Sequence, residues 1–298
     1  MIDLIGLFPA ILRVSTPLLL AALGVHLASR AGVLNIGVEG MMLAGALAGV
    51  VISALTQSEW LGLVAALVAG AALAGLLSVA IHLLRADAVL SGIALNMAAL
   101  AGTTLTLFAI TGDKGISGSL PSRVLPSLHI PFIADVPVLG TLLSGHHVLT
   151  YVALLAVPIV AVFVARTPFG LAMRAVGENP EAAAATGIPV LRVQVTALLA
   201  SGVFAGAGGA FLSMGYVSWF SQNMTAGRGF IALAADVMGF GYAWGTMAAA
   251  LLLGATEAIT LSLQGFGVPS ELLQAIPYLV PVLAMVIHAR RNKTREDH

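Results

Sequence analysis

Three carboxylates interrupt long apolar stretches of the sequence and are the first candidates for chemistry. Glu39, Asp236 and Glu257 each lie inside a run of hydrophobic residues. A charge at the centre of a bilayer costs roughly 2.5–3.5 kcal/mol on insertion scales, so such groups mark a function or have a fixed partner. We favour a structural role for all three, in which they satisfy helix termini or broken helices across a bundle. Asn35 shortly precedes Glu39 and is a candidate cap for the same helix.

A lone amide is the best candidate for contact with a substrate. Asn96 lies in the middle of an apolar run and can both donate and accept hydrogen bonds. This suits a solute with hydrogen-bonding groups, so we expect Asn96 to face a substrate path. An interhelical hydrogen bond explains the residue equally well. The apolar candidates for lining the path are Met97, Phe204, Phe211 and Phe240, although most apolar residues in a bilayer simply pack.

Several classes of chemistry are excluded or unsupported. The chain has no cysteine, which removes disulfides, thiolate metal sites and cysteine nucleophiles. We find no convincing nucleophile–base pair or metal-ligand pair, so we expect neither an enzyme nor a cofactor. The sequence has no Gly-x4-Gly-Lys-Ser/Thr motif, so it does not bind ATP through such a loop. Its 13 basic and 13 acidic residues balance, which argues against a nucleic-acid partner.

The elements that position these residues must be membrane helices. Hydrophobic residues make up 59% of the chain and charged residues 9%, against roughly 25% charged in soluble domains. A helix needs roughly 20 residues to cross a hydrocarbon core of about 30 Å. We therefore predict an all-α integral membrane protein in which residues 1–298 form a single transmembrane domain of about nine helices, with a range of 8–10. The predicted spans are Phe8–Ser29, Ile36–Thr56, Leu61–Leu84, Ala88–Ile110, Val148–Ala165, Val193–Val217, Phe230–Tyr242, Thr246–Leu263 and Leu272–His288.

Two features of these spans guide the packing and the topology. The seventh is short, so we expect it to be broken, tilted or partly re-entrant. Gly45-x3-Gly49 and Gly202-x3-Gly206 are expected to let helix backbones approach closely.

Basic residues in the loops predict the orientation, because cytoplasmic loops carry an excess of lysine and arginine. One side holds nine and the other three, so we place the N-terminus outside and the C-terminus in the cytoplasm. Residues 111–147 are then an extracytoplasmic loop and residues 166–192 a cytoplasmic loop. The predicted inside residues are Arg30, Arg85, Arg166, Arg174, Arg192, Arg290, Arg291, Lys293 and Arg295, and the outside ones Lys114, Arg123 and Arg228.

The cytoplasmic loop contains a short helix with signals at both ends. Asn179 is a good N-cap, and Pro180 suits the first helical position. Glu181 complements the positive helix end, alanines propagate the helix, and Gly187 can end it before Pro189. About two turns of helix are marginal alone in water, so this helix should need a surface to pack against.

This helix resembles a known coupling element. Glu181-Ala182-Ala183-x3-Gly187 is similar to the start of the EAA loop in permeases of ABC importers, whose short helix docks into a groove on the ATPase subunit. The later Ile-x-Leu-Pro element of that family is not evident here. The resemblance implies that the ATPase contacts Glu178, Pro180, Glu181, Ala182, Ala183 and Gly187.

Three further stretches point to one branch of these permeases. Residues 31–43 resemble the signature of permeases for monosaccharides, branched-chain amino acids and nucleosides, and residues 91–96 and 224–235 resemble the nucleoside-type branch. The resemblance implies a bacterial inner-membrane subunit that works with an ABC ATPase, a second permease that is identical or homologous, and an extracytoplasmic solute-binding lipoprotein. It implies transport of nucleosides or related purine compounds, with simple sugars or riboflavin-like solutes as alternatives. An ion-coupled secondary transporter also fits the helices and carboxylates, but it does not explain the EAA-like loop.

Overall fold

The protein is represented by a computed structural model that describes residues 4–128 and 144–263, together with Leu279. Within these ranges the chain forms helices joined by loops, with two isolated β-bridges and no strand. The described part is therefore all-α, as predicted. Its helices are α1 (Leu4–Arg30), α2 (Val38–Thr56), α3 (Glu59–Ser78) with a π-helical continuation (Val79–Leu83), α4 (Ala88–Thr111), α7 (Val148–Arg166), α8 (Pro168–Glu178), α9 (Pro180–Ala185), α10 (Val190–Met214), α11 (Arg228–Met238) and α12 (Ala243–Leu263).

Seven of the described helices are long and apolar enough to cross a membrane: α1, α2, α3 with its continuation, α4, α7, α10 and α12. Each coincides with a predicted span. The seventh predicted span is α11, whose 11 residues rise only about 16 Å, too little to cross the hydrocarbon core. This agrees with the expectation of a broken or re-entrant segment. The last predicted span, 272–288, lies outside the described residues apart from Leu279, which is helical.

Left-handed residues on both sides keep α11 short. Before it, Asn223, Ala226 and Gly227 have φ values of 56°, 48° and 82°. After it, Phe240 and Gly241 have φ values of 52° and 76°. A right-handed helix cannot continue through such residues, so α11 is confined to the 11 residues from Arg228 to Met238.

Helix α10 lies at the centre of the bundle and packs against α1, α2 and α3. Its glycines allow the close approach, because a Cβ on Gly45 of α2 would lie 2.7 Å from the Cα of Gly206. A Cβ on Gly202 would likewise meet the backbone of Gly70 in α3. The two Gly-x3-Gly pairs were predicted as packing sites, and these contacts confirm that prediction for Gly45, Gly202 and Gly206.

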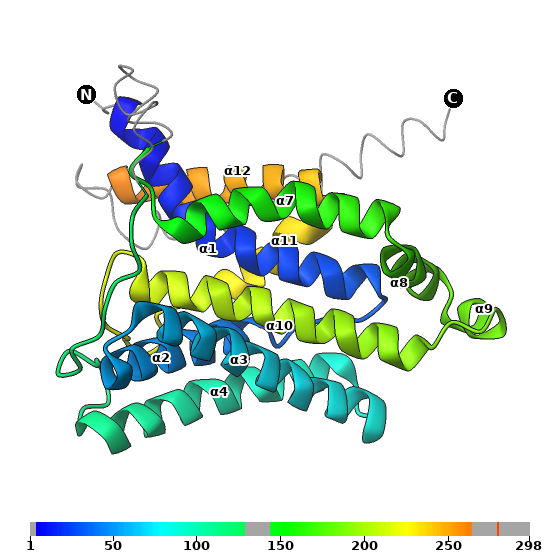
Figure 1. Cartoon of the computed structure of the whole chain (residues 1–298), viewed down its shortest axis with the longest axis horizontal. Helices are drawn as coiled ribbons and strands as arrows, with labels where there is room; N and C mark the ends of the chain where they lie inside the picture. Colours follow the sequence, from blue (N-terminus) through cyan, green and yellow to red (C-terminus); the bar gives the residue numbers. More distant parts are fainter. Residues whose placement is uncertain (1–3, 129–143, 264–278, 280–298) are drawn as a thin grey trace.

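The helices differ widely in how much of their surface the chain itself covers. Figure 1 shows α4 along one edge of the bundle and α7 and α12 along the other. Only 17% of the residues in the spanning part of α4 are buried, against 72% in α2. The apolar side chains on α4 are therefore available to lipid or to another subunit.

Helices α8 and α9 lie together at one end of the bundle, which we call the α9 end (Figure 1). Helix α8 buries Gly170, Met173 and Val176, which share one face. Gly177 packs so closely on the carbonyl of Arg30, at the end of α1, that a Cβ would not fit. The α8–α9 segment is therefore fixed to the bundle.

Candidate functional site

Helix α9 has the local structure that the sequence predicted. The side chain of Asn179 accepts a hydrogen bond from the amide of Ala182 at 3.0 Å. At the other end, the amide of Gly187 donates to Ala184 at 2.9 Å and the amide of Ile188 donates to Ala183 at 3.1 Å. These two bonds form a Schellman motif, in which a left-handed residue closes the helix. Gly187 takes that conformation with φ 86°, which confirms its predicted role as the C-terminal cap.

Most of α9 is exposed. Ala183 is its buried residue and packs against the hydrophobic core of the bundle. Pro180, Glu181 and Ala182 are all exposed, as is Glu178 at the end of α8. A short helix that is seated through one alanine leaves most of its surface free for another protein.

Inside the bundle, Glu39 connects α2 to the beginning of α11. Its carboxylate accepts hydrogen bonds from the Thr225 hydroxyl at 2.6 Å, from the Gly227 amide at 2.8 Å and from the Gly229 amide at 2.6 Å. Glu39 is only 8% exposed. A negative charge at a helix N-terminus is favourable, because the free amides there are electropositive. We call these four residues the polar joint.

Asp236 binds groups from two other helices. Its carboxylate lies 2.9 Å from Nδ1 of His26 and 2.6 Å from the hydroxyl of Ser29, both on α1, and 3.3 Å from the hydroxyl of Thr246 on α12. It therefore joins three helices near the α9 end. His26 and Ser29 were not predicted as partners from the sequence, although their spacing of one helical turn places them on the same face of α1.

The third intramembrane carboxylate, Glu257, forms an ion pair with Arg228, whose Nη2 lies 2.5 Å from Oε1 of the carboxylate. The count of basic residues in the sequence placed Arg228 in an outside loop. The structure corrects this, because Arg228 is the first residue of α11 and is partly buried against α12. Burial favours pairing, since an unpaired charge there would lose its hydration.

The two asparagines also bind within the protein. Asn35 does not cap α2 as predicted, because the helix begins after Gly37 without a side-chain cap. Its amide instead donates to the hydroxyl of Ser201 on α10 at 2.8 Å. Asn96 accepts from the amide of Gly40 at 2.8 Å and donates to the carbonyl of Ile36 at 2.9 Å. Its amide thus holds α4 against the first turn of α2 and the non-helical segment before it. These bonds are of the interhelical kind that the sequence analysis gave as the alternative role of Asn96. Contact between Asn96 and a substrate stays a prediction.

The five residues predicted to line a substrate path do not come together in one cavity. Met97, beside Asn96, is 68% exposed on the outer surface of α4. Phe204 packs near Gly24 of α1, whereas Phe211 lies two turns further along α10, near its last residue. Phe240 is exposed in the turn between α11 and α12. The positions of these five residues therefore do not support the prediction that they line one substrate path.

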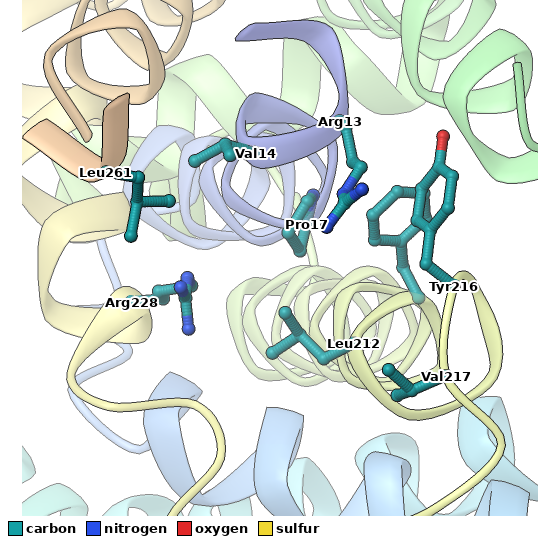
Figure 2. A pocket seen from close by; sticks show the side chains of 9 residues that line it. Arg13, Val14, Pro17, Leu212, Tyr216, Val217, Arg228 and Leu261 are labelled. Carbon is teal, nitrogen blue, oxygen red and sulfur yellow. The ribbon is translucent and has the colours of Figure 1, made fainter. Parts of the chain in front are cut away.

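Phe211 does line a small cavity of about 190 Å³ between α1, the end of α10, α11 and α12. Figure 2 shows the guanidinium of Arg13 beside the ring of Tyr216, with Arg228 across the cavity. The carbon of the Arg13 guanidinium lies 4.6 Å from the centre of that ring. Arg13 and Tyr216 could not be paired from the sequence because they are some 200 positions apart.

Two titratable groups next to this cavity are held neutral. Burial lowers the pKa of His147, which directly precedes α7, to about 4. Burial also raises the pKa of Tyr216, an effect that the nearby charge of Arg13 partly opposes. Both side chains therefore stay uncharged between pH 6 and pH 8.

Comparison with known proteins identifies the family of this chain. A family model described as "Branched-chain amino acid transport system / permease component" matches residues 7–287. This chain belongs to that family of ABC permeases. The permease is therefore a transport subunit, and its family has no catalytic role of its own.

Several curated relatives resemble the permease over most of its length. A guanosine ABC transporter permease protein from Bacillus subtilis is 35% identical, over 93% of this chain and 90% of its own. A nucleoside ABC transporter permease protein from Lactococcus lactis is 32% identical, over 92% and 89%. A provisionally named glucose ABC transporter permease protein from Haloferax volcanii is 39% identical, over 87% and 78%. Each of these organisms has a second, less similar relative named for the same substrate. No solved structure matches the chain.

Proposed function

We propose that the permease carries nucleosides or related purine compounds into the cell, and that a separate ATPase subunit drives it by binding α9. The observation that supports this most directly is the geometry of α9. It is capped at both ends, seated through Ala183 and otherwise exposed. Closure of a pair of ATPase subunits would move α9, and the fixed α8 would transmit that movement to α1.

The orientation of this proposal places the α9 end in the cytoplasm. Among the described residues, five basic side chains lie at or near that end: Arg30, Arg85, Arg166, Arg174 and Arg192. With Arg228 removed from the count, Lys114 and Arg123 remain in the described part of the opposite loop. The excess of basic residues supports a cytoplasmic α9 end and an extracytoplasmic 111–147 loop.

Cysteine labelling tests this orientation cleanly, because the natural chain has no cysteine. Single cysteines at Ser119 and at Ala184, both exposed, should react with a membrane-impermeant maleimide from opposite sides of the membrane. Reaction of both from the same side would reject the topology.

The partners follow from the same proposal. We infer an ABC ATPase, an extracytoplasmic solute-binding lipoprotein and a second permease subunit in the bacterial inner membrane. The exposed apolar surface of α4 leaves room for that second subunit. The paired relatives in three organisms favour a homologous partner over an identical one.

The substrate is tested with the assembled transporter in proteoliposomes. We expect uptake of labelled guanosine that needs ATP, stops with vanadate and continues with ionophores. The second candidate substrate is glucose, which the 39% identical relative favours. Uptake of glucose without guanosine would overturn the nucleoside assignment, and uptake driven by an ion gradient would overturn the ABC mechanism.

The predicted substrate contact of Asn96 needs its own test, since its amide holds the start of α2. Asn96→Ala should reduce uptake and leave assembly with the ATPase intact if the residue borders the path. Normal uptake would end that assignment. Loss of the folded permease would instead assign Asn96 to packing alone.

A further inference from the structure

A second cavity, of about 610 Å³, lies at the α9 end among α1, α7, α8 and the turn between α11 and α12. Three arginines line it, namely Arg30, Arg166 and Arg174, and Glu178 is the carboxylate in its lining. Three positive charges and one negative charge give these four side chains a net charge of +2. A cavity with this balance attracts anions.

The arginines have no carboxylate partner among the described residues. The ion pairs within the described part of the chain are His26–Asp236 and Arg228–Glu257, and neither includes one of these arginines. His26 also lines the cavity, but its Nδ1 already faces Asp236. The buried Nε of Arg30 has no hydrogen-bond partner in the described part of the chain. The cavity therefore contains guanidinium donors that suit phosphate oxygens, which accept such bonds in pairs.

The rim of the cavity has the character of a membrane interface. Tyr242 is 73% exposed and Trp244 is 54% exposed, and they flank the first residue of the spanning helix α12. Tyrosine and tryptophan are enriched at this depth of a bilayer, where the ring is partly apolar and its polar atom is hydrated. The headgroup region of the membrane should therefore lie at the level of the cavity.

An apolar surface continues from the cavity along α7. Val162 lines the cavity and is exposed, and Ile159 and Leu155 extend the exposed surface by two turns of the helix. Figure 1 shows α7 and α12 along the same edge of the bundle, with α8 at the end of α7. A lipid with its headgroup among the arginines could place its acyl chains on this surface.

We propose that the cavity binds the phosphate of an anionic phospholipid, such as phosphatidylglycerol. The guanidinium groups supply the donors, the interfacial aromatics set the depth, and α7 supplies a surface for acyl chains. Basic pockets between membrane helices on the cytoplasmic side are suited to such headgroups. A zwitterionic lipid would place its ammonium group in the same positive field and bind less well.

The bound lipid would stabilise α8 and the proposed coupling helix α9 that follows it. Arg166 is the last residue of α7, whereas Arg174 lies on α8, which leads directly into α9. A phosphate held by both would fix α8 relative to the membrane. This role depends on insertion in a bilayer and on the orientation above, and not on which solute is transported.

Native mass spectrometry of the purified full-length permease tests the proposal, with equal amounts of phosphatidylglycerol and phosphatidylcholine added. Wild type should retain phosphatidylglycerol preferentially. The double variant Arg166→Gln/Arg174→Gln should bind it about 25-fold more weakly, since each basic residue near an anionic surface contributes about a factor of five. Arg166→Lys/Arg174→Lys should keep most of the preference. Arg192→Gln is the matched control, because Arg192 is exposed near the same end but does not line the cavity.

Three outcomes would overturn the proposal. One is equal retention of the two lipids by wild type, or equal binding of phosphatidylglycerol by the double variant and the control. The second is displacement of the lipid by millimolar glycerol 3-phosphate, which would assign the cavity to a free phosphate compound. The third is complete release of the lipid when the ATPase subunit binds, which would assign the surface to that protein. If the double variant loses its helical circular dichroism, the exposed Arg166→Gln alone should still weaken binding about five-fold.

Discussion

Helix α9 and the polar joint both satisfy free groups at helix ends, yet they are built in opposite ways. In α9 the caps at Asn179 and Gly187 are eight positions apart and make their bonds within the same loop. In the polar joint Glu39 reaches the start of α11, 186 to 190 positions away. The first arrangement shapes an exposed local element, whereas the second holds distant helices together. We therefore expect changes in α9 to affect coupling, and changes in the joint to affect folding.

The largest effect should follow Glu39→Ala. It removes a buried carboxylate that accepts three hydrogen bonds and leaves the amides of Gly227 and Gly229 without their acceptor. A buried donor left unsatisfied costs about 1–3 kcal/mol, so we expect the free energy of unfolding to fall by about 3 kcal/mol or more. Unfolding of the purified permease in mixed detergent micelles with increasing dodecyl sulfate measures this.

A control for that change is Glu59→Ala, in the first turn of α3, where no side-chain hydrogen bond of the glutamate is seen within the described ranges. Its unfolding curve should stay close to wild type. If Glu39→Ala and Glu59→Ala unfold at the same dodecyl sulfate fraction, the joint does not hold α2 and α11 together.

A somewhat smaller effect should follow Gly229→Ala, which tests the packing of the same joint and not its charge. Gly229 lies in the first turn of α11, and a Cβ there would come within 2.6 Å of the Cα of Glu39. Overpacking of this kind costs about 2 kcal/mol. The same unfolding measurement should show that loss. A wild-type curve would mean that α11 can shift away from α2 without cost.

A third prediction contrasts this glycine with Gly187, where an added Cβ would meet open space but the backbone is left-handed. Gly187→Val should strain the end of α9 by about 1–2 kcal/mol and leave the unfolding of the bundle almost unchanged. Transport and stimulation of the ATPase should fall together. Gly187→Asn is the matched control, since asparagine tolerates this conformation, and it should retain most of the activity. A valine variant that couples normally would separate α9 from transport.

The same contrast explains what the sequence could and could not predict. The determinants of α9 are neighbours in the chain, so residue types alone predicted its first residue and its cap at Gly187. The partners of Glu39 and Asp236 come close to these carboxylates only when α1, α2, α11 and α12 pack together. The sequence could therefore indicate that the two acids have partners, but it could not identify those partners. The length of α11 likewise depends on left-handed residues such as Ala226, whose type gives no warning. Arg228 was misplaced for a related reason, because its partner Glu257 is on another helix.

The smallest effect should follow Asn179→Ala, which removes the other cap of α9. The lost bond joins the side chain to the amide of Ala182, and such caps contribute about 1 kcal/mol. Pro180 still presets the first turn and Gly187 still closes the last, so the helix should fray at its start and not disappear. We expect a drop in ATPase stimulation of a few fold at most, with unfolding of the bundle unchanged. Asn179→Asp keeps an acceptor at the same position and should restore coupling. An alanine variant that loses more activity than Gly187→Val would show that Asn179 contacts the ATPase itself, because the loss of a cap alone is too small to account for it.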